Sequence, residues 1–321
     1  MADIKKILMN AIEDSNANVR KSAALAIGNL KAKEGTQALI ELTKDKHWQI
    51  QEAAITSLGF LEAKAAAEPL KEILKATKGD LRKAILDNLM GKGGDGGSKE
   101  QSGPFGGGGG GKKKEEVPVQ VKKAAALALS RILPEAAVDP MIEMLASDND
   151  NLKIAALAGL GNMMATKAAP KIIPLLQSDK LPIKKTATII LGRIKAKEAV
   201  PQLIQSLSDK NEGIRMETVI ALNHLKPPEA LKPITELLKD PAQDVRKTAA
   251  IALGNTKSDE VIEPLLSAIK DTSADVRKAV ITSLANLKAK DAMGQIALLL
   301  GDSSEDVRGA AAAAYSNLNA I

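Results

Sequence analysis

The sequence contains no cysteine and very few aromatic residues. Without cysteine the chain can form no disulfide bond, no thiolate nucleophile and no cysteine-ligated zinc site. Aromatic residues make up 1% of the 321 residues, although hydrophobic residues of all kinds make up 45%. The apolar content is therefore mostly Ala, Leu, Ile and Val, which suits close packing of helix on helix and supplies little bulk for one large central core.

Long apolar runs and a dominant charge are absent as well. No hydrophobic stretch approaches the length that spans a bilayer, and residues 1–6 lead into an amphipathic helical pattern rather than an apolar signal core. We therefore predict a cytoplasmic protein with no membrane contact. The net charge of +6 comes from 45 basic and 39 acidic residues, so it permits an acidic partner without demanding one.

The sequence is instead rich in internal repetition. An aliphatic anchor followed by an amphipathic helical pattern recurs along the chain, and successive anchors are 31 residues apart except for one step of 40. The anchors are Val19, Ile50, Leu81, Val121, Leu152, Ile183, Ile214, Val245, Val276 and Val307. Apolar or small residues follow each anchor at positions +4, +8 and usually +11, which is the apolar stripe of a helix that we call helix B.

A second helical run, helix A, follows a short turn after each helix B. Proline falls in its first turn, at Pro170, Pro201, Pro233 and Pro264, where the backbone has no intrahelical hydrogen bond to lose. Neither helix can bury its stripe alone, so the repeats must stack. The predicted fold is an all-α solenoid of about ten 31-residue repeats of two helices each.

Polar and small residues recur at fixed places in this repeat. Glycine at position +9, as in Gly28, Gly59, Gly161, Gly192 and Gly254, would allow close approach of neighbouring backbones. Aspartates in the link to the next helix B, at Asp209, Asp240, Asp271 and Asp302, are expected to cap turns and helix starts. The acidic residue before an anchor and the Arg after it, such as Asp275 and Arg277, are expected to form a ladder between repeats.

The segment from Asp244 to Gly254 reads Asp-Val-Arg-Lys-Thr-Ala-Ala-Ile-Ala-Leu-Gly, and looser copies of it cover about 290 of the 321 residues. It resembles the HEAT-like repeats of prokaryotes, of the type first named from phycobilisome lyases. The resemblance implies a right-handed, armadillo-like superhelix with the A helices on its convex face and the B helices on its concave face. It also implies that partners bind the concave face.

The 40-residue step contains a glycine-rich segment. Residues 91–111 hold twelve of the 24 glycines, and each costs about 1 kcal/mol relative to Ala in a helix. We therefore predict that the helix A before Val121 is replaced by a flexible loop. The predicted organisation is residues 1–90, N-terminal repeats; 91–120, glycine-rich insertion; and 121–321, C-terminal repeats.

Two interpretations of this loop stay open: a solvated remnant of a degenerate repeat, or an element that closes on a partner through Phe105, Lys112, Lys113 and Lys114. Gly106 to Lys112 fits the phosphate-binding pattern G-x-x-x-x-G-K, but Lys113 stands where Ser or Thr should bind magnesium and no strand precedes the loop. Nucleotide binding is therefore not predicted.

Residues for catalysis or metal binding form no pattern. The two histidines, His47 and His224, are not spaced as metal ligands with other histidines or carboxylates. We predict no enzyme activity and no cofactor. Trp48 is interpreted as an apolar lid on its repeat or an anchor for a partner.

Three positions of helix B should point away from the apolar stripe, onto the concave side. Position +2 carries lysines, +6 large aliphatic residues and +10 polar residues, and the candidates are Lys123, Lys185 and Lys247; Leu127, Ile189, Ile220 and Ile251; and Arg131, Arg193, His224 and Asn255. The +6 residues are either an exposed apolar patch or part of the packing between repeats. The lysines are either a solvated face or a contact for an acidic partner. Few aromatics are present to stack on bases, which weighs against nucleic acid as the partner.

These surfaces would suit an amphipathic helix or an extended segment of another protein. The sequence thus predicts a non-enzymatic interaction scaffold or adaptor, compatible with a role as a complex subunit. The alternative is an accessory lyase-like or chaperone subunit that acts on a cofactor-bearing protein, and a lesser alternative is nucleic-acid binding.

Overall fold

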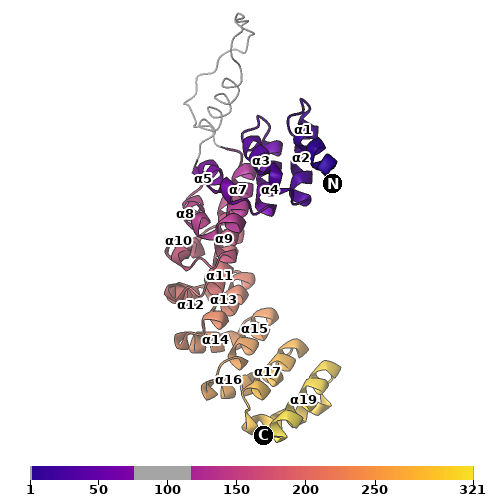
Figure 1. The fold of residues 1–321 in the computed structure, drawn as a ribbon. Helices are drawn as coiled ribbons and strands as arrows, with labels where there is room; N and C mark the ends of the chain where they lie inside the picture. The colour runs from indigo at the N-terminus through magenta and orange to yellow at the C-terminus, as the bar shows by residue number, and fades with distance from the viewer. Residues whose placement is uncertain (1, 76–116, 321) are drawn as a thin grey trace, which may run out of the picture. The chain divides into compact units, whose positions relative to one another are not determined.

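The computed structural model describes residues 2–75 and 117–320, and all regular elements in these segments are helices (Figure 1). The chain divides into two compact units, residues 1–163 and 164–321. Each unit is a stack of repeats in which a helix A is followed by a helix B. The predicted division at residues 91–120 stays a prediction, because most of that segment lies outside the described residues.

The first unit contains four B helices and their A helices within its described residues. Its elements are α1 (Ala2–Ala11), α2 (Ala17–Asn29), η1 (Lys33–Gly35), α3 (Thr36–Leu42), α4 (Trp48–Phe60), η2 (Lys64–Ala66), α5 (Ala67–Lys75), α7 (Val119–Ile132), α8 (Pro134–Met144) and α9 (Asp150–Asn162). The B helices are α2, α4, α7 and α9, and each packs on the next one.

The second unit repeats the arrangement with short A helices that often continue as a 3-10 turn. Its first elements are η3 (Thr166–Ala168), α10 (Ala169–Ile172), η4 (Ile173–Gln177), α11 (Leu181–Arg193), η5 (Lys197–Ala199), α12 (Val200–Ser206), α13 (Glu212–Leu225), η6 (Pro228–Ala230), α14 (Leu231–Glu236) and η7 (Leu237–Lys239). They are followed by α15 (Gln243–Gly254), η8 (Asp259–Val261), α16 (Ile262–Ala268), α17 (Ala274–Asn286), η9 (Lys290–Ala292), α18 (Met293–Leu298), η10 (Leu299–Gly301) and α19 (Glu305–Asn319).

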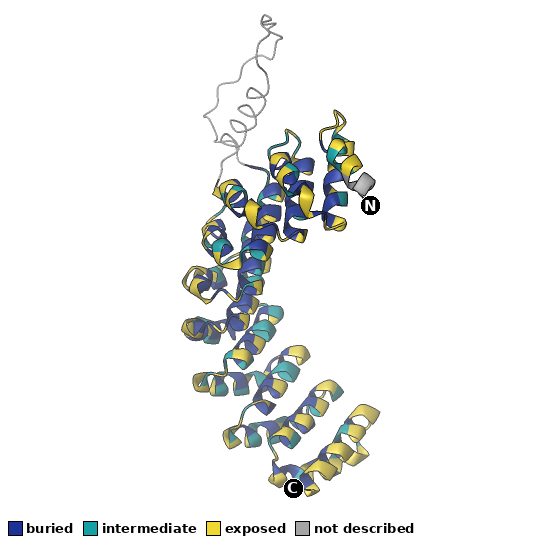
Figure 2. Ribbon diagram, in the orientation of Figure 1, coloured by how far each residue is buried: buried dark blue, intermediate teal, exposed yellow. Residues whose placement is uncertain are grey.

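The B helices of this unit, α11, α13, α15, α17 and α19, form one row in which each packs on the next, and the A helices form a second row (Figure 1). The core lies between the two rows, where Figure 2 shows the buried residues. The anchors supply much of it: those from Ile183 to Val307 are buried in the second unit, as are Ile50, Val121 and Leu152 in the first. The predicted all-α solenoid is therefore confirmed, although the anchor Val19 is partly exposed.

The arrangement of helices before Val121, where the spacing between anchors is 40 residues, differs from the prediction. Helix α5 packs on α7, and α7 packs on α4. A Cβ at Gly59 in α4 would lie 3.0 Å from Ala128 in α7. The pair α2 and α4 shows the same contact, because a Cβ at Gly28 in α2 would meet Ser57 in α4. In both pairs the glycine is at position +9 of its helix and its neighbour at position +7. Thus α7 is the helix B that follows α4, and α5 is its helix A.

The prediction that the Val121 helix lacks a helix A was therefore wrong. Helices α5 and α7 pair because they pack against each other, although a long stretch of chain separates them in the sequence. Leu81 and the glycine-rich segment, with Phe105, Lys112, Lys113 and Lys114, lie outside the described residues, between α5 and α7 in the chain.

A ladder of charged hydrogen bonds connects successive repeats. The basic residue just after the anchor bonds to the aspartate in the following A–B linker, 25 residues later, in the pairs Arg20–Asp45, Lys184–Asp209, Arg215–Asp240, Arg246–Asp271 and Arg277–Asp302. In the Arg215–Asp240 pair both guanidinium–carboxylate distances are 2.7 Å. Nη1 of Arg215 also donates to the carbonyl of Asp209 in its own linker, at 2.8 Å.

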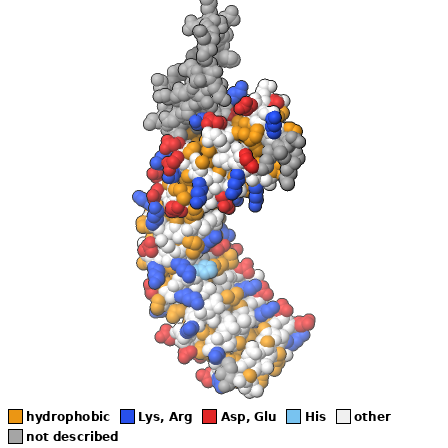
Figure 3. All heavy atoms as spheres, in the orientation of Figure 1, with side chains coloured by type: hydrophobic (Ala, Val, Ile, Leu, Met, Phe, Trp, Pro, Cys, Tyr) orange, Lys and Arg blue, Asp and Glu red, His pale blue; other side chains and the backbone are white. Residues whose placement is uncertain are grey.

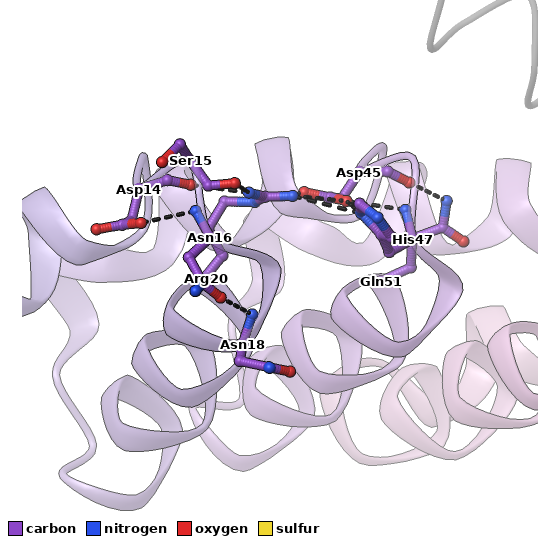
Figure 4. A network of polar contacts seen from close by, with 8 residues as sticks. All are labelled: Asp14, Ser15, Asn16, Asn18, Arg20, Asp45, His47 and Gln51. Atoms are coloured by element: carbon purple, nitrogen blue, oxygen red, sulfur yellow. Dashed lines mark hydrogen bonds and ion pairs between the residues drawn. The ribbon is translucent and has the colours of Figure 1, made fainter.

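The carboxylate has a second role in the turn. Asp240 accepts a hydrogen bond from the backbone NH of Ala242 at 2.8 Å, which confirms that the linker aspartates cap turns. Figure 4 shows the same network around Arg20, Asp45 and His47 in the first unit.

The ladder was predicted, but its pairing was not. Arg277 bonds to Asp302, whereas the carboxylate before the anchor, Asp275, pairs with Lys247 of the preceding helix B at 3.0 Å. The partner of the arginine lies in a linker, which helical periodicity alone does not locate.

We predict that Gly192→Ala destabilises the second unit. The added Cβ would lie 2.6 Å from Cα of Ala221 on α13, so the two helices must move apart, at a cost of about 1–3 kcal/mol. Gly309→Ala on α19 is the control, because its Cβ meets nothing within 4 Å, and helix propensity should make it about 0.5–1 kcal/mol more stable. Urea denaturation monitored by circular dichroism measures both, and equal effects of the two substitutions would contradict close packing at Gly192.

We also predict that the ladder makes stability depend on pH. Burial alone would raise the pKa of Asp240, but the hydrogen bonds from Arg215 and from the NH of Ala242 outweigh it and lower the pKa below its ordinary value. Because the folded-state pKa lies below the unfolded one, the contribution is complete above about pH 4 and is lost as the pH falls towards the folded-state pKa.

Asp240→Asn should therefore lower the free energy of unfolding by about 1–3 kcal/mol at pH 7 and by less at pH 3. Urea denaturation at both pH values measures the difference. Asp244→Asn, at an exposed position in the first turn of α15, should show a smaller effect at pH 7. A loss for Asp240→Asn that is the same at both pH values would contradict the charged ladder.

Candidate functional site

The +6 positions of three neighbouring B helices carry exposed isoleucines. Ile189 of α11, Ile220 of α13 and Ile251 of α15 are 39%, 37% and 46% exposed. The residues that precede them, Thr188, Val219 and Ala250, are fully buried. Of the two interpretations, packing between repeats and an exposed patch, the structure favours the patch. We call Ile189, Ile220 and Ile251 the isoleucine row.

The lysines at +2 lie one helical turn before this row, but two of the three candidates are paired. Lys185 lies 3.3 Å from Glu217 on α13, and Lys247 lies 3.0 Å from Asp275 on α17. Such exposed pairs add little stability, but they neutralise the lysines. On the face that Figure 3 shows, basic side chains alternate with acidic and hydrophobic ones. This arrangement differs from the continuous basic stripe expected for binding to a phosphate backbone.

The polar residues at +10 lie one turn after the row. Arg193, His224 and Asn255 are all exposed. Within the described residues their side chains make no hydrogen bond, so their donors and acceptors are available to a ligand. The structure therefore brings an apolar and a polar position together on one face of α11, α13 and α15, with a lysine one turn before them on α11 and α15.

The candidates in the first unit share the same helix face but have a different environment. Lys123, Leu127 and Arg131 are exposed on α7. The guanidinium of Arg131 lies 5.1 Å from the ring centroid of Phe60 on α4, a cation–π contact that holds it in place. Sequence analysis missed Phe60, although it occupies position +10 of its helix, where Arg131 stands in α7.

His47 and Trp48 lie at the start of α4. Nδ1 of His47 is 3.1 Å from Asp45 and 3.4 Å from Nη2 of Arg20, so this histidine extends the first rung of the ladder (Figure 4). Trp48 is partly exposed, and its role as a lid or an anchor stays open.

Two kinds of site are not found in the part of the chain that the structure describes. No group of three or more histidine, aspartate and glutamate residues could hold a metal ion there. None of the helices in residues 2–75 and 117–320 is long and apolar enough to cross a membrane.

The family model for HEAT repeats matches residues 5–90, 169–249 and 232–316 of the chain. The chain therefore belongs to the HEAT repeat family, which confirms the resemblance in its sequence. No curated protein matches it.

Two solved structures, of Kap95p and Kap121p, show a similar fold at low sequence identity. Kap95p, in a structure titled for its effect on RanGDP, is 14% identical with a TM-score of 0.63, and the match covers 99% of this chain and 45% of that one. Kap121p is 13% identical with a TM-score of 0.61, covering 99% and 38%. YibA from Escherichia coli is 15% identical with a TM-score of 0.49, covering 98% and 92%. The chain thus has a solenoid fold of the kind typical of protein-interaction scaffolds, and it spans less than half the length of Kap95p and Kap121p.

We predict that the isoleucine row contributes little to folding. Ile251→Ala should cost about 1 kcal/mol or less, because nearly half of this side chain is already in water. Leu253→Ala, two residues further along α15 and fully buried, should cost about 2–5 kcal/mol. Urea denaturation of the two variants gives the comparison, and similar losses would show that the row belongs to the core.

Proposed function

We propose that this protein is a non-enzymatic interaction scaffold or adaptor that binds a segment of another protein along the B-helix face, the predicted concave face. The observation that carries the proposal is the isoleucine row, in which three large apolar side chains are exposed on successive helices. Repeat solenoids commonly use such extended surfaces for binding. A cytoplasmic location and a role as a complex subunit are part of the same proposal.

The spacing of the row suggests the form of the partner. Packed helices lie about 8–10 Å apart, so neighbouring isoleucines are separated by roughly the length of three residues of extended chain at about 3.3 Å each. An extended segment also leaves backbone groups unpaired, and the side chains at +10 offer hydrogen bonds to them. We therefore favour an extended segment with an apolar residue at about every third position over an amphipathic helix.

The other candidate functions have less support. Paired lysines and the scarcity of aromatic residues weigh against nucleic acid. A lyase-like or chaperone subunit would need a surface for a cofactor-bearing protein, and no feature of the described residues favours such a substrate.

We predict that a double substitution in the row, Ile220→Asp with Ile251→Asp, strongly weakens partner binding. Each buried isoleucine contributes about 1.5–3 kcal/mol, so the loss of two should weaken binding at least about 100-fold. Affinity purification with mass spectrometry identifies the partner, and titration calorimetry then gives the affinity.

Leu298→Asp is the matched control, because Leu298 is an exposed aliphatic residue on α18, a helix A. It should bind the partner like the unaltered chain. A partner that binds the double variant with unchanged affinity, while circular dichroism shows all proteins folded, would contradict the proposal.

A further inference from the structure

A cavity of about 310 Å³ lies at the C-terminal ends of α13 and α15. Its apolar walls include Leu222, Ile234 and Leu253, all of which are buried. Lys226, Lys257 and Asn255 line it as well, and both lysines are exposed. Asn255 is one helical turn beyond Ile251 along α15, so the cavity lies near the isoleucine row, towards the C-terminal ends of its helices.

The repeats on either side, those of α11 and α17, have an alanine at the corresponding place in this turn. A lysine or other residue with positive φ at position +12 turns the chain, and the alanine at +13 donates its NH to the carbonyl at +8, as in a Schellman motif. In α11 these residues are Lys195, with φ 55°, and Ala196, whose NH lies 3.0 Å from the carbonyl oxygen of Leu191. Ala196 is buried by this turn, as is Ala289 after α17.

The two repeats in between both lack this alanine. After α13 the residue is Pro227, which has no NH to donate. After α15 it is Ser258, and Lys257 before it does not have positive φ. Thr256 also replaces the larger Leu or Ile that neighbouring repeats have at position +11. The cavity therefore lies where two adjacent repeats depart from the regular turn.

The cavity has the size and chemistry for one aromatic side chain. Its volume is at the low end of the roughly 300–1,000 Å³ of small-ligand pockets, and an aromatic side chain buries about 150–250 Å². Lys226 and Lys257, which line the cavity, make no ion pair within the described residues. Glu229 and Asp259 follow in η6 and η8 but do not line it. A carboxylate beside the aromatic ring would meet two unpaired positive charges.

We infer that this cavity is the anchor site of the partner segment and receives an aromatic side chain that is adjacent to an acidic residue. The inference rests on the proposed function and specifies the partner's chemistry. The segment would lie along the isoleucine row and place its aromatic residue in the cavity at the C-terminal ends of α13 and α15.

The probe for the cavity itself is indole-3-acetate, which combines an aromatic ring with a carboxylate. Methyl NMR of the full chain should show saturable shifts at Leu222, Ile234 and Leu253, with a dissociation constant of about 1 mM for so small a ligand. Indole-3-acetamide, which lacks the charge, should bind several-fold more weakly. The absence of shifts at these methyl groups would overturn the inference.

Thr256→Leu restores the residue of the neighbouring repeats and should weaken indole-3-acetate binding at least tenfold. Thr282→Leu is the control, because Thr282 is an exposed threonine on α17 whose hydroxyl likewise bonds to a backbone carbonyl. If Thr256→Leu does not fold, the double variant Lys226→Gln with Lys257→Gln replaces it. That variant should bind both probes equally, and a retained preference for the acetate would contradict the role of the lysines.

A random peptide library displayed on phage separates the anchor from the proposed function. Selected peptides should carry an aromatic residue next to Asp or Glu, and should bind Thr256→Leu at least tenfold more weakly than the unaltered chain. Peptides that depend on Ile220 and Ile251 but not on Thr256 would overturn the anchor and leave the proposed function intact. Selection that yields no peptide dependent on the row would contradict the proposed function, and with it the anchor.

Discussion

Where it forms, the bond between the basic residue of one helix B and the aspartate of the next linker fixes the relation of a repeat to its neighbour. Arg215 holds its own linker through Nη1 and Asp240 through Nε and Nη2, while Asp240 caps the turn that starts α15. One side chain thereby connects the linkers before two successive B helices. Because this connection sets the axial alignment of one helix B relative to the next, it also places Ile220 beside Ile251 on the surface.

The ladder specifies alignment more than it supplies stability. In α4 its place is taken by Gln51, whose amide donates to the carbonyl of Asp45, and in α7 by Lys122, opposite Ser147 in the next linker. The helices still pack there, through contacts such as Gly59 against Ala128. Partly buried ion pairs gain little net free energy after desolvation, whereas the buried anchors contribute a hydrophobic term in every repeat.

The sequence predicted those features that follow from a constant period. The spacing of 31 residues located the helices, and the helical repeat placed Ile189, Ile220 and Ile251 on the exposed side. It did not predict that α5 pairs with α7, because only packing decides which helices meet across an insertion. Pro227 and Ser258 mark the site of the cavity in the sequence, because they replace the alanine of the neighbouring repeats. The sequence alone does not show the importance of this replacement, since the role of the alanine in the turn is seen only in the structure, as at Ala196.

A regular row and an irregular cavity have complementary roles in binding. An extended segment that contacts only identical isoleucines could shift by one repeat, or about three residues, and keep most of its contacts. The missing alanines occur at α13 and α15, whereas the turns after α11 and α17 have them. A residue that fits only this cavity would penalise every shifted alignment, because the shift would leave its aromatic side chain without a pocket. The row would then supply affinity along the segment, and the cavity would fix where the segment begins.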